Sequence, residues 1–335
     1  MKGKQLLRSV AGAGLLPCLI SKAVSAADNK RNIRRMDDSS PVIGIMTQPL
    51  QDSNSTMIAA SYVKWIEAGG ARSIPIPYDA TPDEVQEIFQ QVNGVLFTGG
   101  AADLPQAAVT IWKEALYAYN HDDDFFPIWG TCLGFEWLLE LGSGDPEILQ
   151  SGFLSENISL PLETVDQYHL YKPQRIHEIV TKNNITMNNH HQGITPEQFS
   201  SSDRLKQLWR ITSTNHDLSG RQFVSSIEPN DPLRLPIYGV QYHPEKNTFE
   251  YATYPGTDIP YEAINHSKEG IEMSMYLAQF FVDLARQNNH QFTQPDTYPL
   301  MYTYPVKEGV KFEQIFVIPP SQQRPAGSSS KNLKA

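Results

Sequence analysis

Cysteine, basic charge and metal-ligand patterns are all scarce in this chain of 335 residues. Lys and Arg number 27 against 37 Asp and Glu, and the formal net charge is -10 at pH 7. This balance gives no electrostatic footprint for nucleic acid and no steering toward anionic membranes. The histidines show no metal-ligand spacing, so neither a metal nor another cofactor is expected. The composition therefore favours small molecules as partners.

Long apolar runs are also missing, apart from a short one near the N-terminus. Three basic residues precede an apolar stretch over residues 10–20, and the small residues Val24-Ser25-Ala26 follow it. The stretch has about half of the roughly 20 residues that a membrane-spanning helix needs. This order is typical of a secretory signal peptide, which we assign to residues 1–26.

The only cysteines are Cys18 and Cys132, and removal of a signal peptide would take Cys18 away. A secreted chain with one thiol has no internal disulfide, so that thiol either bridges two molecules or is reactive. Passage through a glycosylating compartment also agrees with four Asn-x-Ser/Thr sequons. These predicted glycosylation sites are Asn54, Asn157, Asn184 and Asn265.

The first half of the chain alternates between strand-like and helix-like patterns. Short apolar runs predict buried strands at residues 42–46, 73–77 and 94–98, and a fourth that ends just before Cys132. Helices are predicted between them, at residues 58–68, 81–89 and 110–119. The second helix opens with the capping pattern Thr81-Pro82-Asp83-Glu84. Such alternation is typical of an α/β fold with a doubly wound, largely parallel central sheet.

The second half has shorter strand-like pieces and then one amphipathic helix, over residues 271–285. Strands are predicted at residues 175–180, 208–212, 223–227 and 237–242, which indicates a mixed sheet. No composition break or internal repeat suggests a second domain. We therefore predict a disordered lead-in at 27–40, one catalytic domain at 41–318 and a disordered tail at 319–335.

The pentapeptide Gly130-Thr131-Cys132-Leu133-Gly134 has the pattern of a nucleophile elbow, a tight turn between a strand and a helix. Glycines two residues either side let the thiol approach a substrate without neighbouring side chains in the way. The N-terminus of a helix also favours the thiolate, which is the reactive form. The alternative is a buried structural cysteine beside turn glycines.

A second motif, His243-Pro244-Glu245, follows the predicted strand 237–242. A cysteine nucleophile needs a base, so His243 could deprotonate Cys132 while Glu245 fixes the imidazole tautomer. Taken alone, the tripeptide is more often an ordinary loop at the end of a strand. Its combination with an elbow more than 100 residues upstream is far more specific.

The two motifs together resemble the class I glutamine-amidotransferase superfamily and, within it, the gamma-glutamyl hydrolase family. The similarity extends from about residue 41 to about residue 318 and implies a flavodoxin-like three-layer sandwich. The segments that carry it are residues 41–45, 58–64, 96–100, 126–136, 238–246 and 285–290. One departure is that Thr56-Met57 stand where the family commonly has an aromatic pair, so a tyrosine that contacts substrate is missing.

The resemblance implies a secreted or lysosomal/vacuolar enzyme that hydrolyses the γ-linked glutamyl chains of folylpolyglutamates. Cys132 would form a thioester, His243 would act as acid and base, and Glu245 would orient His243. Gly100 and Leu133 match the backbone donors of the oxyanion hole. The substrate-binding positions are Gly99 and His190, with the alternative that the register is shifted by one to His191. The family also suggests a homodimer.

Three alternatives remain open from the sequence. A glutaminase that supplies ammonia to a synthase would normally need a synthetic domain, which this chain does not show. A hydrolase of other γ-glutamyl amides would share the same elbow. A non-catalytic binding relative would keep the fold, but it would have no physical need to retain Cys132, His243 and Glu245 together.

Overall fold

The computed structural model describes residues 40–320, apart from 52, 123, 165–167 and 310. The predicted signal peptide, residues 27–39 of the lead-in and residues 321–335 of the tail lie outside the described residues. The described residues all belong to one compact unit. Within the described part of the chain, no helix is long and apolar enough to cross a membrane.

The centre of the fold is a sheet of eight strands, five of which are parallel. In chain order the parallel strands are β1 (Val42–Met46), β4 (Arg72–Ile76), β5 (Gly94–Phe97), β6 (Ile128–Thr131) and β12 (Ile237–Val240). Their order across the sheet is β4-β1-β5-β6-β12, which is the 2-1-3-4-5 order of flavodoxin-like folds. Antiparallel strands extend one edge: β11 (Gln222–Pro229), β10 (Trp209–His216) and β8 (Glu163–Thr164). The predicted largely parallel α/β sheet is confirmed.

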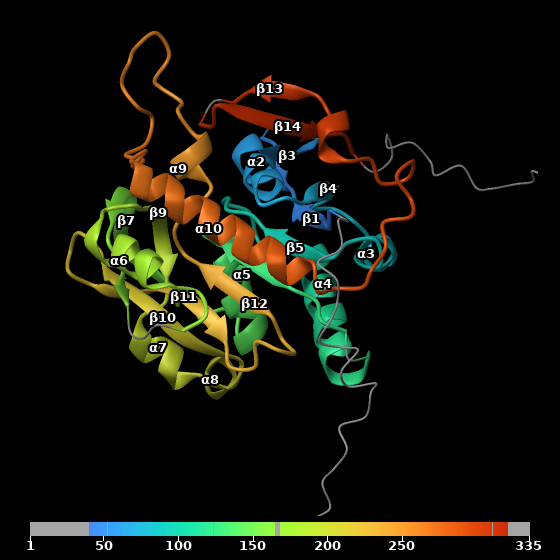
Figure 1. Cartoon of the computed structure of the whole chain (residues 1–335), viewed down its shortest axis with the longest axis horizontal. Helices are drawn as coiled ribbons and strands as arrows, with labels where there is room; N and C mark the ends of the chain where they lie inside the picture. The colour runs from blue at the N-terminus through green and yellow to red at the C-terminus, as the bar shows by residue number, and fades with distance from the viewer. Residues whose placement is uncertain (1–39, 52, 123, 165–167, 310, 321–335) are drawn as a thin grey trace, which may run out of the picture. The chain divides into compact units, whose positions relative to one another are not determined.

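Helices cover both faces of this sheet, because side chains along each strand point alternately to the two sides. In β1, Ile43 and Ile45 pack into the core under α2 (Ala60–Ala68) and α10 (Lys268–Ala285). Val42 and Met46 face the opposite core, under α3 (Pro82–Phe89), α4 (Gln106–Tyr117) and α5 (Leu133–Ser143). Figure 1 shows α10 lying across the sheet. The result is the expected three-layer sandwich.

The predicted start of the second helix is confirmed, since the Thr81 hydroxyl accepts a hydrogen bond from the Glu84 N–H at 3.3 Å. The first predicted helix begins two residues later than expected. Residues 56–59 form β3 (Thr56–Ala59), which pairs with β14 (Gln314–Ile318). An apolar run of this length is compatible with either a helix or a strand. Pairing with β14, which lies far away in the sequence, favours the strand.

The strand predicted at residues 175–180 is wrong, because this segment lies within helix α6 (Gln174–Lys182). Ile176, Ile179 and Val180 are buried at helical spacing, while the polar residues between them face outward. The predictions at 208–212, 223–227, 237–242 and 271–285 correspond to β10, β11, β12 and α10 with shifted ends.

Two small sheets flank the carboxyl ends of the parallel strands and were not predicted. One joins β7 (Gln150–Leu160) to β9 (Thr186–Gly193). The other has the order β13 (Val306–Glu308), β14, β3 and β2 (Gln48–Pro49). The remaining elements are η1 (Ala118–Asp122), α7 (Pro196–Ser201), α8 (Asp203–Leu208), α9 (Lys246–Phe249) and η2 (Met301–Thr303).

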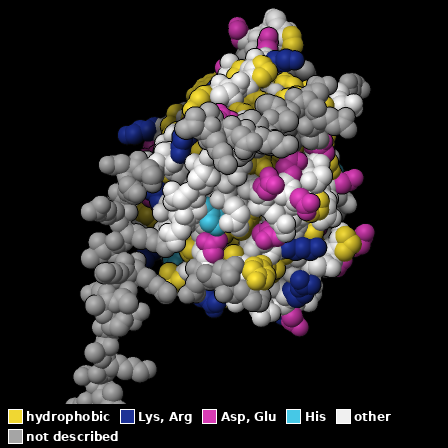
Figure 2. Space-filling model, turned by 90° about the vertical axis from the view of Figure 1, so that its right-hand side faces the viewer, with side chains coloured by type: hydrophobic (Ala, Val, Ile, Leu, Met, Phe, Trp, Pro, Cys, Tyr) yellow, Lys and Arg dark blue, Asp and Glu magenta, His cyan; other side chains and the backbone are white. Residues whose placement is uncertain are grey.

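On the face drawn in Figure 2, acidic and basic side chains of the described residues are interspersed.

Candidate active site

Cys132 lies in the turn between β6 and α5, with a φ of 53° in the left-handed region. Side chains other than glycine rarely adopt this conformation, and it is characteristic of a strained nucleophile turn. A Cβ on Gly130 would lie 2.6 Å from the Gly134 carbonyl oxygen, and one on Gly134 would overlap the Phe97 carbonyl of β5. Both glycines are therefore required by close backbone contacts, and the strand-turn-helix that the pentapeptide predicts is present.

Gly134→Ala tests this packing. The added methyl group would meet backbone atoms of Phe97, which cannot rotate away, so we expect a loss of about 1–3 kcal/mol in unfolding free energy or a displaced turn. Gly193→Ala is the matched control, because its Cβ would meet only ordinary contacts, the nearest at 3.4 Å. Denaturant unfolding and the rate of Cys132 alkylation measure the two effects. An unchanged Gly134→Ala protein would contradict this account of the turn.

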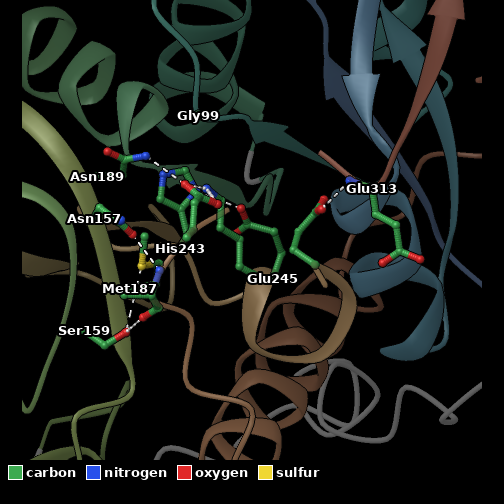
Figure 3. Close-up of polar contacts among 12 residues, drawn as sticks. Gly99, Asn157, Ser159, Met187, Asn189, His243, Glu245 and Glu313 are labelled. Carbon is green, nitrogen blue, oxygen red and sulfur yellow. Dashed lines mark hydrogen bonds and ion pairs between the residues drawn. The ribbon is translucent and has the colours of Figure 1, made fainter. Parts of the chain in front are cut away.

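His243 and Glu245 form a buried pair beside Cys132. Nδ1 of His243 lies 2.8 Å from Oε1 of Glu245, and the two side chains are 8% and 1% exposed. The backbone N–H of His243 donates to the Met187 carbonyl of β9 at 2.8 Å, which fixes the loop (Figure 3). Because Glu245 occupies Nδ1, the imidazole keeps Nε2 for a reacting group.

Gly99 lies between the side chains of Cys132 and His243. A Cβ at this position would lie 2.6 Å from Cε1 of His243 and 3.4 Å from Cβ of Cys132. Any larger residue at position 99 would separate the two side chains. The structure thus brings Cys132 and His243 together, although they are more than 100 residues apart in the sequence.

Tyr62 is a residue of this site that the sequence analysis did not single out. Its hydroxyl accepts a hydrogen bond from the Gly99 N–H at 2.8 Å and lies 3.4 Å from Nδ1 of His243. Burial, together with the charges of Glu245 and Cys132, raises the pKa of Tyr62 well above its usual value. The phenol therefore stays neutral. The sequence could have pointed to Tyr62, because this residue lies in segment 58–64, which is one of those that carry the family resemblance.

These side chains open into a cavity of about 730 Å³, within the size range of small-molecule sites. Cys132, His243 and Tyr62 line it together with residues of both small sheets. Among the described residues, no group of three or more His, Cys, Asp and Glu side chains could hold a metal ion. The other lining residues are Gln48, Pro49, Leu50, Gln51, Met57, Gly99, Gly100, Ala101, Ala102, Asn189, Lys246, Tyr261, Glu262, Glu308, Lys311, Phe312 and Ile315.

The two predicted oxyanion positions, Gly100 and Leu133, lie in the same region of the structure as Cys132. The N–H of Leu133 is directed toward the sulfur of Cys132, and Gly100 follows Gly99 along the cavity wall. Within the described part of the chain, neither N–H donates to a backbone carbonyl. A Cβ at Gly100 would collide with the Gln48 amide, so this position also needs glycine. An oxyanion hole made by these two N–H groups stays a prediction.

Comparison with known proteins places this arrangement in a family. Residues 41–245 match the family model described as peptidase C26. The chain belongs to the peptidase C26 family. It is 35% identical to gamma-glutamyl hydrolase B of Dictyostelium discoideum, over 84% of this chain and 83% of that protein. It is 33% identical to gamma-glutamyl hydrolase of Homo sapiens, over 84% of this chain and 90% of that protein.

A plant relative and one solved structure complete the comparison. Gamma-glutamyl hydrolase 1 of Arabidopsis thaliana is 33% identical, over 85% of this chain and 81% of its own length. A crystal structure of a glutamine amidotransferase from Methylobacillus flagellatus is similar with a TM-score of 0.43 and 12% identity, over 75% of this chain and 96% of that one. The strand order is the evidence for the fold.

In this peptidase C26 member two effects on the Cys132 thiol oppose each other, because its position at the N-terminus of α5 favours the thiolate and its burial disfavours it. Burial raises the pKa of Cys132 well above its usual value, and the Glu136 carboxylate adds to this effect. Lys246 and the Leu133 N–H lower the pKa but do not outweigh burial. A raised pKa means that a neighbouring base would have to accept the proton of Cys132 before the sulfur could attack, and His243 is the base that the sequence predicts.

Glu136 offers a test of this electrostatic balance. It is buried one helical turn after Cys132, and Nε2 of Gln241 donates to its Oε1 at 2.9 Å. Burial nevertheless raises the pKa of Glu136 to about 7. Above that pH the carboxylate is ionised and opposes a second negative charge on the thiol.

We expect Glu136→Gln to lower the pKa of Cys132, because it removes this charge and keeps an acceptor for Gln241. Alkylation of Cys132 by iodoacetamide should be about 3- to 10-fold faster than in the wild type at about pH 8.5, and unchanged at about pH 5.5. Glu140→Gln is the control, since this carboxylate is farther along the same helix and should not change the alkaline rate. Equal rates for Glu136→Gln and wild type at every pH would show that Glu136 does not influence the thiol.

The structure places the predicted substrate-binding histidine behind the cavity wall. His190 lies in β9, is only 4% exposed, and packs edge-on against Phe223 at 4.9 Å. Nδ1 of His190 is hydrogen-bonded to the Gln192 carbonyl at 2.7 Å, and burial lowers the pKa of the imidazole to about 4. Its neighbour Asn189 lines the cavity. A role for His190 in binding substrate stays a prediction.

The position of His191 does not support the alternative register, in which this residue would bind substrate. The side chain of His191 is 70% exposed and lies 3.8 Å from Glu156. Like His190, His191 belongs to strand β9.

The four sequons differ in how far they are accessible. Asn54, Asn157 and Asn184 are exposed, whereas Asn265 is half-buried and its amide nitrogen donates to the Asn184 carbonyl at 2.8 Å. A glycan on Asn265 would have to replace that hydrogen bond.

Proposed function

We propose that this chain is a cysteine-dependent γ-glutamyl hydrolase that shortens the poly-γ-glutamate tails of folates. The observation that carries the proposal is the meeting of Cys132 and His243 at Gly99, with Glu245 bonded to the far side of the imidazole. The relatives named gamma-glutamyl hydrolase support the substrate class. The cavity of about 730 Å³ is large enough for a small molecule with a glutamyl tail.

The proposed reaction begins with transfer of the Cys132 proton to Nε2 of His243 as the sulfur attacks the γ-carbonyl carbon. The N–H groups of Gly100 and Leu133 stabilise the oxyanion that forms, and each such donor typically lowers the barrier by about 3 kcal/mol. His243 returns the proton to the leaving amine nitrogen, and a thioester on Cys132 remains. Water, deprotonated by His243, then attacks the thioester and releases the acid and the thiol.

The experiment is incubation of purified protein with pteroyl-pentaglutamate, followed by mass analysis of the products. The expected result is a shortened pteroyl product together with glutamate or γ-linked glutamyl peptides. Glutamine in a parallel reaction serves as the control for a glutaminase. Deamidation of glutamine with an intact pentaglutamate would overturn the proposal.

We also propose that the protein enters the secretory pathway and works outside the cell or in a lysosome or vacuole. The support is the signal pattern of residues 1–26 and the exposed sequons at Asn54, Asn157 and Asn184. Expression in a secreting eukaryotic cell should give a mature chain that begins near Ala27 and loses mass when glycans are removed enzymatically. Retention of residues 1–26 would contradict this route.

A further inference from the structure

Lys246 occupies an unusual position for a lysine, buried in the cavity that holds the catalytic thiol. It is the first residue of α9, and its backbone N–H donates to the His243 carbonyl at 3.4 Å. Its side chain is only 4% exposed, and the residue lines the same cavity as Cys132. The other lysine of the cavity, Lys311, is exposed. Lys246 is therefore the buried cation of this site.

The ammonium group of Lys246 is held by a carboxylate from a different segment. Nζ lies 2.6 Å from both oxygens of Glu262, whose side chain is 8% exposed. Burying two charges costs several kcal/mol each before their attraction is counted, so apolar residues often serve stability equally well. A buried ion pair that lines a catalytic cavity therefore suggests a role in binding. An ammonium has three N–H donors, and two contacts leave one for a ligand.

Several hydrogen bonds fix Glu262 in place. Nδ2 of Asn189 donates to Oε1 of Glu262 at 2.7 Å. The next residue, Ala263, donates its N–H to Oδ1 of Asn157 at 2.6 Å and accepts from the Ser159 hydroxyl at 2.7 Å. Figure 3 shows these residues of β7 and β9 close to His243. The segment that holds Lys246 is thus tied to a strand pair, and the ammonium is positioned before any substrate arrives.

Resting on the proposed function, we infer that Lys246 binds the α-carboxylate of the glutamyl residue whose γ-carbonyl is attacked. In a γ-linked chain every residue keeps a free α-carboxylate, separated from the reacting carbonyl by three carbon atoms. In an α-linked glutamyl peptide the side-chain carboxylate lies at the same separation, and the two linkages differ in where the amino nitrogen stands. A buried cation beside Cys132 would therefore select a residue with a free carboxylate three carbon atoms from the reacting carbonyl. Lys246 also lowers the pKa of the thiol, which agrees with its being near the reacting atoms.

The test compares two substrates that differ only in this group: a γ-linked glutamyl peptide and the same peptide with an α-carboxamide at the residue to be cleaved. Wild type should prefer the carboxylate. Lys246→Met should lower kcat/KM for the carboxylate substrate by about 10- to 100-fold, mainly through KM, because a hydrogen bond to a charged group is lost. The carboxamide substrate should change by less than about threefold. Lys246→Arg, which keeps the charge, should retain a preference for the carboxylate.

Lys182→Met is the control and should leave the preference unchanged, because this lysine is exposed at the end of α6 and does not line the cavity. If Lys246→Met does not fold, Lys246→Gln replaces it, since an amide can still donate to Glu262 without a charge. Equal losses of kcat/KM on both substrates would overturn the inference. They would show that Lys246 only holds the segment of Glu262 in position. Cleavage of both substrates by wild type without preference would overturn it as well. A wild-type protein inactive on both substrates would instead overturn the proposed function.

Discussion

Replacement of Cys132 by serine is expected to lower kcat for γ-glutamyl hydrolysis by at least about 10⁴-fold. A serine hydroxyl is far less acidic than a thiol, and the burial that already raises the pKa of Cys132 would disfavour an alkoxide still more. The variant should fold normally. The backbone N–H of residue 132 would still donate to the Val240 carbonyl, a bond of 2.9 Å that does not involve the side chain.

Steady-state kinetics, thermal unfolding and substrate affinity of Cys132→Ser together check this expectation. The unfolding temperature and the affinity should match those of wild type while turnover is lost, which separates chemistry from folding and binding. Turnover within about tenfold of wild type would contradict a cysteine nucleophile. Direct attack by water, assisted by His243, would then be the simplest reaction.

His243→Ala is expected to lower kcat by about 10³- to 10⁴-fold, because both the attack and the protonation of the leaving amine need this imidazole. The raised pKa of Cys132 strengthens the expectation, since a protonated thiol cannot react without a base. The variant also leaves the buried carboxylate of Glu245 without its histidine, so some loss of stability should accompany the loss of activity.

His191→Ala is the matched control for His243→Ala, because His191 is a 70% exposed histidine on β9 and should leave kcat unchanged. His190→Ala should have an effect between the two, since its ring is packed against Phe223. Kinetics of the three variants at one pH, with unfolding curves, make the comparison. Equal and mild losses for His243→Ala and His190→Ala would be incompatible with His243 as the base.

The sequence predicted the placement of Cys132, His243 and Glu245 better than it predicted the segments around them, because the patterns that contain these three residues are local. The elbow around Cys132 and the spacing of His243 and Glu245 are short patterns whose geometry the neighbouring residues largely determine. The parallel strands also carry a local signal, because strands covered on both faces are continuously apolar.

The missed features depend on contacts between distant segments. Strand β3 at Thr56–Ala59 pairs along its whole length with β14, some 250 residues later, as in the pairing of Ile58 with Phe316, and it pairs with β2 on its other side. The Lys246 ion pair needs Glu262, in a segment with no regular pattern of its own. The pKa of Cys132 likewise depends on burial by the whole fold, which outweighs the effect of one helix N-terminus.

The central claim is that hydrolysis proceeds through an acyl group carried by Cys132. The most direct measurement is rapid acid quenching of wild type during turnover of a γ-glutamyl substrate, followed by peptide mapping by mass spectrometry. The account predicts a transient mass increase equal to the acyl group, on the peptide that contains Cys132 and on no other. It also predicts that iodoacetamide modifies the same residue and that substrate slows this reaction. Full turnover with no adduct on that peptide at any quench time, and undiminished activity after alkylation of Cys132, would contradict it.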